Sequence, residues 1–279
     1  MTKKSKISIK GEPKIVSEIR DHILSSFTGL EFQEEGHKYF LNGVSMPSVS
    51  KIIEGFVPPT DWDSVAENYA VKNGETAQYW LDKWKFNNLK ATTSGTLTHE
   101  FGESLGWLRN GHPELITESC KPKFIKENNW LIPTRPKEEA VLRFWDEIDP
   151  RLHLVLEEAK IFNTNVTQPY CGTFDLLMYF MDELDHSKDG LVVLDYKTNG
   201  SLTSNFSRER GKMMLPPFAD YFDEAKSHYV IQQSAYVCAL REIGLDVRGI
   251  RLIWLKDEGT YELIPLPDIS KEQWFKDAI

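Results

Sequence analysis

Residues 154–198 contain three apolar runs: LVLEEAKIF (154–162), TFDLLMYF (173–180) and LVVLDYKT (191–198). Each run is short, apolar-rich and bounded by polar segments, which indicates three successive β-strands. A helix over about 223–242 and two more strands, GIRLIWLK (249–256) and TYELIPL (260–266), follow. This order predicts an α/β fold with a mixed central β-sheet flanked by helices.

Three carboxylates in these runs line up when the strands are paired. Partners in an antiparallel hairpin have residue numbers with a constant sum, and for Asp175 and Asp195 the midpoint of that sum lies in the polar loop 181–190. For Glu158 and Asp175 the midpoint lies in the loop 163–170. Like charges on neighbouring strands destabilise a sheet, and a divalent cation with oxygen ligands would remove that repulsion. The pattern therefore predicts a cation site.

Lys197 follows Asp195 by two residues, so both side chains lie on one face of the strand. An ammonium beside metal-binding carboxylates can orient a water molecule or stabilise a developing negative charge. The alternative interpretation is an ordinary Asp–Lys pair on a surface strand. A single bulge would also move one carboxylate to the other face.

Composition and charge set limits on function. Of 279 residues, 41% are hydrophobic and 27% are charged, which is typical of a globular protein. No apolar run approaches the roughly 20 residues needed to span a bilayer, and the basic start lacks a secretory signal, so we expect a cytoplasmic protein with no membrane partner. The net charge of −9 repels a polyanion at long range, so nucleic-acid binding would depend on a local basic surface or on metal ions.

The chain divides into a leader and one domain. We expect residues 1–35 to form a loosely attached leader or helix, and 36–279 to form a single domain with a hairpin at Asn42–Gly43. Within that domain we expect a helical part over about 51–150 and a sheet core over about 151–279. The tryptophans of the helical part (Trp62, Trp80, Trp84 and Trp107) are interpreted as core residues in preference to base-stacking platforms.

The same residues resemble a known family. Gly172–Asp175 and the Asp195/Lys197 pair look like the GxxD and DxK motifs of the PD-(D/E)XK nuclease superfamily. Gln232 and Tyr236 match the QxxxY motif of its RecB-like exonuclease branch, and Gly95–His99 is similar to that branch's GTxxH. The motifs occur in the family's order between about residues 36 and 266, and the segment MPSVSKII resembles the opening of phage-type members. The resemblance implies a restriction-endonuclease-like core.

The resemblance also implies a site. It would hold one or two Mg²⁺ or Mn²⁺ ions on His99, Glu158, Asp175, Asp195 and the carbonyl of Tyr196, with Lys197, Gln232 and Tyr236 assisting catalysis. His99 and Glu103 share one face of a helix that Ser94 could cap, and a solvent-facing polar pair is the alternative. Cys120, Cys171 and Cys238 are too few for the iron–sulfur cluster of some relatives, so we expect none and interpret them as packing residues.

The implied activity is metal-dependent hydrolysis of DNA by an exonuclease, in recombination, repair or phage genome processing. The alternatives are a structure-specific or restriction-type endonuclease and a DNA-binding or scaffolding subunit that does not cut. The expected partner is DNA, with a recombination or replication protein as a further candidate, in a bacterial or phage-infected cell. The loop 199–217 is either a clamp on DNA or a surface loop, and its candidate contacts are Arg208, Arg210 and Lys212.

Overall fold

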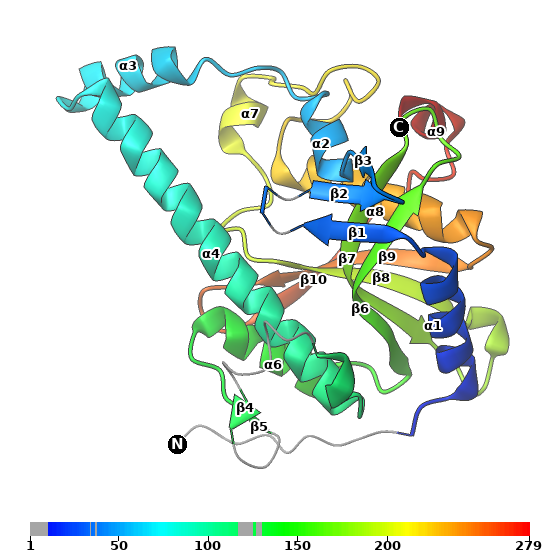
Figure 1. Cartoon of the computed structure of the whole chain (residues 1–279). Coiled ribbons are helices and arrows are strands. Elements are labelled where there is room, and N and C mark those ends of the chain that lie inside the picture. Colours follow the sequence, from blue (N-terminus) through cyan, green and yellow to red (C-terminus); the bar gives the residue numbers. More distant parts are fainter. Residues whose placement is uncertain (1–10, 34, 37, 117–124, 127–129) are drawn as a thin grey trace.

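A computed structural model describes residues 11–33, 35–36, 38–116, 125–126 and 130–279 (Figure 1). The helices are α1 (Lys14–Ser26), α2 (Val49–Glu54), α3 (Trp62–Asn73), α4 (Ala77–Arg109), α6 (Pro136–Glu147), α7 (Asn205–Glu209), α8 (Ala225–Glu242) and α9 (Gln273–Ala278). The strands are β1 (Leu30–Gln33), β2 (Lys38–Leu41), β3 (Val44–Met46), β4 (Ile125–Lys126), β5 (Trp130–Leu131), β6 (Leu152–Asn163), β7 (Tyr170–Phe180), β8 (Gly190–Lys197), β9 (Val247–Leu255) and β10 (Tyr261–Leu266). The fold is mixed α/β.

The central sheet has the strand order β10-β9-β8-β7-β6. β8 and β9 run parallel and the other neighbours run antiparallel, so the predicted mixed sheet is confirmed. The predicted strand register is confirmed as well. Leu176 of β7 lies opposite Leu194 of β8 on one side and Glu157 of β6 on the other, as the two constant sums require. The β6–β7 register shifts by one residue at Val155, upstream of the acidic residues.

Helices cover both faces of β8. Four consecutive residues, Val193 to Tyr196, are buried, which happens only when neither face of a strand meets solvent. The Tyr196 ring packs against α4 at Gly102, and its hydroxyl accepts a hydrogen bond from Trp145 of α6. The next side chain, Lys197, points the opposite way and lies over the ring of Tyr229 in α8. Helices α4 and α6 therefore cover one side of this strand and α8 the other.

The N-terminal region is attached more firmly than its sequence suggests. α1 is a helix as expected, but it is not loosely attached, because Val16 and Ile23 are fully buried in the main core. Arg20 donates from Nε to the carbonyl of Val155 at 2.7 Å, at the shift in the β6 register. The expected hairpin at Asn42–Gly43 is confirmed, with both residues at positive φ, and β1 adds a third strand to it.

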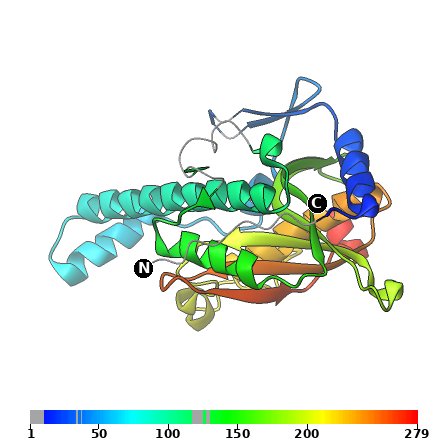
Figure 2. The same cartoon turned by 90° about the horizontal axis from the view of Figure 1, so that it is seen from below.

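Helix α4 is the longest element and carries the candidate ligand His99. It begins at Ala77, where the Thr76 hydroxyl accepts from the backbone N–H of Tyr79, so Ser94 lies inside the helix and is not its cap. Figures 1 and 2 show that α3 and the first half of α4 project from the body as an arm. No helix in the described ranges is long and apolar enough to cross a membrane.

The expectation that the tryptophans and cysteines are packing residues holds only in part. Trp107 is buried in the core, but Trp62 at the start of α3 is 58% exposed. Cys171 and Cys238 are buried free thiols, and burial raises the pKa of each. Cys120 lies outside the described residues.

Candidate metal centre

Three side chains from three elements converge beside the end of β8. His99 of α4, Glu158 of β6 and Asp175 of β7 each place one possible ligand atom within 4.8 Å of the other two. The Nδ1 atom of His99 lies 3.2 Å from Oδ2 of Asp175 and 3.8 Å from Oε1 of Glu158. The structure therefore brings together three of the residues singled out from the sequence.

Glu158 has an unusual backbone. Its φ is +48°, while Glu157 and Ala159 on either side keep their pairing with β7. A residue with a Cβ rarely adopts this left-handed conformation, and such residues concentrate at functional sites because the surrounding structure must hold them there. Here the strained residue is the one whose carboxylate faces His99.

Asp175 occupies a fork between two strands. The regular β7–β8 pairing reaches only to Leu176 and Leu194 on this side. Beyond it, Oδ2 of Asp175 accepts a hydrogen bond from the backbone N–H of Tyr196 at 2.7 Å. The Asp175 carboxylate thus accepts from a backbone N–H of β8 where the regular pairing has ended, and this bond holds it within reach of His99. That the carbonyl of Tyr196 is a metal ligand stays a prediction.

The charges at this site control one another. Burial opposes protonation of His99, but the charges of Asp175 and Glu158 and its hydrogen bonds to them outweigh burial and raise its pKa to about 10. Burial raises the pKa of Glu158 to about 7, against the opposing effect of His99. Asp175 is also buried, yet His99 and Lys197 lower its pKa. A protonated imidazole therefore compensates the carboxylates in the metal-free protein.

Asp195 lies beside this group and not within it. Among the described residues the 4.8 Å group comprises His99, Glu158 and Asp175, while Asp195 is ion-paired with Nζ of Lys197. Burial and the nearby charge of Asp175 raise the pKa of Asp195 to about 6. Burial would lower the pKa of Lys197, but Asp195 and Asp175 raise it. Asp195 as a metal ligand stays a prediction, since it lies outside the 4.8 Å group.

Sequence reasoning missed the residues that support this group. Added Cβ atoms at Gly102 and Gly106 would lie 2.7 Å from the Tyr196 ring and 2.2 Å from the Glu157 carboxylate, so α4 packs closely only because these positions are glycines. Glu157 is itself buried, and burial together with Glu103 raises its pKa well above the ordinary value. The glycines are four residues apart, on one helix face, and that spacing was the available signal.

Tyr229 was also missed, although it lies three residues before Gln232. Its ring lies 4.4 Å from Nζ of Lys197, and its hydroxyl donates to Oδ1 of Asn199 at 2.7 Å. Gln232 itself donates to the hydroxyl of Ser50 in α2 at 3.1 Å. Tyr236 is buried, and its ring occupies the space that a side chain at position 172 would need. Helix α8 therefore presents Tyr229, not Gln232, to the lysine.

The three basic residues of the loop 199–217 have partners within the fold. Arg208 forms two hydrogen bonds with the Glu224 carboxylate, at 2.9 and 2.7 Å. Lys212 pairs with Asp223 at 2.7 Å. Arg210 lies over the Phe206 ring, 4.6 Å from its centroid. The loop is held by two ion pairs, which leaves Arg208 and Lys212 poorly suited to act as free cations.

The donor set fits a divalent metal ion. Carboxylate oxygens suit Mg²⁺ and Mn²⁺, and a neutral imidazole is a common metal ligand. The raised pKa of Glu158 supports this fit, because a cation would remove the cost of its charge. No protein-family model matches the chain, and no curated protein matches it.

Proposed function

We propose that this protein is a metal-dependent DNA nuclease with a restriction-endonuclease-like core, and that it acts as a RecB-like exonuclease. The observation that carries the proposal is the convergence of His99, Glu158 and Asp175, with the Asp195–Lys197 pair on the adjacent strand. The mixed five-stranded sheet supports the proposed core. His99 of the GTxxH motif lies 3.2 Å from Asp175 of the GxxD motif, although the two are 76 positions apart in the sequence.

In this proposal His99, Glu158 and Asp175 would hold one Mg²⁺ or Mn²⁺, and Asp195 would join on binding. The ion supplies a water of lowered pKa and a positive charge against the phosphate. The chain's own contribution is electrostatic and positional. Lys197 stays protonated next to Asp195, and its ammonium group lies over the Tyr229 ring, so it would supply a fixed positive charge against the charge that develops on the phosphate.

Incubation with end-labelled linear DNA and with covalently closed DNA tests the proposal, each with Mg²⁺, Mn²⁺ or chelator. We expect cleavage of the linear DNA from an end, dependent on metal, and sparing of the closed circle. Asp175→Asn and Lys197→Ala should each lower the cleavage rate by about 100-fold or more, since a single electrostatic group at a reacting centre contributes that much. Matched changes at exposed positions, Asp21→Asn and Lys188→Ala, should leave it unchanged.

The outcomes separate the alternatives. Nicking of supercoiled circles as fast as digestion of linear DNA would favour an endonuclease. Binding of DNA without cleavage under every metal condition would favour a subunit that does not cut. Normal turnover by purified Asp175→Asn would refute the assignment of the site.

A further inference from the structure

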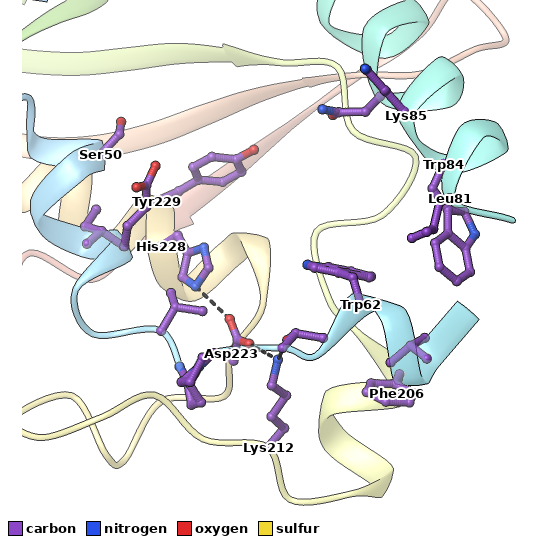
Figure 3. Close-up of a pocket in the computed structure, with 18 of the residues that line it drawn as sticks. Ser50, Trp62, Leu81, Trp84, Lys85, Phe206, Lys212, Asp223, His228 and Tyr229 are labelled. Carbon is purple, nitrogen blue, oxygen red and sulfur yellow. Dashed lines mark hydrogen bonds and ion pairs between the residues drawn. The ribbon is translucent and has the colours of Figure 1, made fainter. Parts of the chain in front are cut away.

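A large cavity separates the helical arm from the sheet core. Its volume is about 1330 Å³, and it lies between α3 and α4 on one side and α2, α7 and α8 on the other. Figure 3 shows Trp62 within this cavity, with Trp84 and Lys85 contributed by α4 and His228 and Tyr229 by α8. None of these tryptophans belongs to the candidate metal centre.

The aromatic walls of the cavity are exposed and held in place. Trp62 and Phe206 are 58% and 56% exposed, so both rings are accessible to a ligand in the cavity. Trp62 lies 5.9 Å from Trp84 between ring centroids, and Tyr69 meets Trp84 edge-on at 5.3 Å. These contacts hold the Trp62 ring in position. A ligand that binds to it would therefore lose little free energy to ordering of this side chain.

The cavity borders the metal centre. Tyr229 lines it, and the ammonium group of Lys197 lies over the same ring, 4.4 Å from its centroid. Helix α4 makes a second connection: Trp84 and His99 are 15 positions apart, hence about 22 Å along the helix and on nearly one face. Between them, at Gly95, an added Cβ would lie 3.3 Å from Thr198, the residue after Lys197. The cavity therefore adjoins Lys197 through Tyr229, and α4 runs from the cavity to His99.

Charge in the cavity is modest. Two lysines, Lys85 and Lys212, and two acidic residues, Glu54 and Asp223, line it. Lys212 pairs with Asp223, which also contacts His228 at 3.0 Å. Such a wall offers little to the dense phosphates of a duplex. It suits a strand whose bases are unpaired, since only unpaired bases present a free face to an aromatic ring.

We propose that this cavity binds unpaired DNA, with bases stacked on Trp62 and Phe206 and the strand leading along α4 to the metal centre. This inference rests on the proposed nuclease function and specifies its substrate as a single-stranded end. The arm is then a substrate-binding element, and its exposed tryptophan has a reason to be there.

Binding can be measured without cleavage, in chelator, with a labelled oligothymidylate of about 16 nucleotides, the upper site size of single-strand binding folds. We expect the oligonucleotide to quench tryptophan fluorescence and to bind at least about tenfold more tightly than a duplex of equal length. Trp62→Ala and Phe206→Ala should each weaken binding by about fivefold or more. Trp62→Phe should retain most of it.

Trp274→Ala is the matched control, because Trp274 is a partly exposed tryptophan of α9, outside the cavity, and its loss should leave binding unchanged. Mn²⁺ binding, followed by electron paramagnetic resonance, should be equal in all variants and shows that the metal centre is intact. Unchanged affinity in folded Trp62→Ala and Phe206→Ala overturns the proposal, and so does equal binding of the duplex. Cleavage with either result leaves the nuclease function standing, whereas Trp62-dependent binding without cleavage refutes the nuclease function alone.

Discussion

The backbone of Glu158 gives the sharpest test of the site, because strain and side-chain chemistry can be separated there. Its φ of +48° costs a residue with a Cβ about 1–2 kcal/mol relative to glycine. Elsewhere in a strand glycine is less stable than alanine by about 0.5–1 kcal/mol, for reasons of chain entropy. We therefore expect Glu158→Gly to be at least as stable as Glu158→Ala, by about 0–1.5 kcal/mol, although both lack the carboxylate.

Lys160 provides the matched position. It is exposed on the same strand, pairs with Thr173 and has no positive φ, so Lys160→Gly should be less stable than Lys160→Ala. The Ala-to-Gly difference should change by about 1–2 kcal/mol between the two positions, and that change is the strain itself. Urea unfolding of the four variants in chelator measures it. The same order of stability at both positions would refute strain at Glu158.

Metal binding at pH 8 should release about one proton from His99, because its pKa of about 10 keeps the imidazole protonated before the metal binds, whereas a metal ligand must be neutral. Titration calorimetry in buffers of different ionisation enthalpy measures this proton release. Binding heats that do not depend on the buffer would show that His99 does not lose a proton to become a ligand. The Asp195–Lys197 pair should behave as a unit, so Lys197→Met combined with Asp195→Asn should be more stable than the two separate losses predict, by about 0.5–3 kcal/mol. Additive losses in a denaturation cycle would contradict that coupling. Binding of single-stranded DNA should depend weakly on salt, with a log–log slope no steeper than about −1.4 for two lysines in the cavity, and a much steeper slope would place the strand elsewhere.

The sheet was predictable because its signals are local. Each strand from β6 to β10 is an apolar run with polar boundaries, and a hairpin fixes its register once the loop is known. Hence the expected register that places Glu158, Asp175 and Asp195 on neighbouring strands followed from the sequence. The register shift at Val155 lies outside the segment that carries the acidic residues, so it did not disturb that alignment.

Helix α4 was harder to predict. Its residues between Lys85 and Thr98 are mostly polar and lack an apolar stripe, because this half of the helix stands away from the core. The start at Ala77 depends on the Thr76 cap and on packing with α3, 22 positions before His99. The predicted cap at Ser94 is wrong because the helix begins at Ala77 and Ser94 lies inside it.

By itself the sequence determined the strands, their pairing and the residue types that a metal ion prefers, because alternation, turn loops and donor chemistry are properties of short segments. Only the tertiary structure decided which carboxylates meet. Asp175 turns toward His99 because β7 and β8 are no longer paired before Leu176, whereas Asp195 turns toward Lys197 on the side covered by α8. The exposure of Trp62 was decided in the same way, by where the arm lies. These outcomes depend on contacts between segments far apart in the chain, whose energies no local pattern contains.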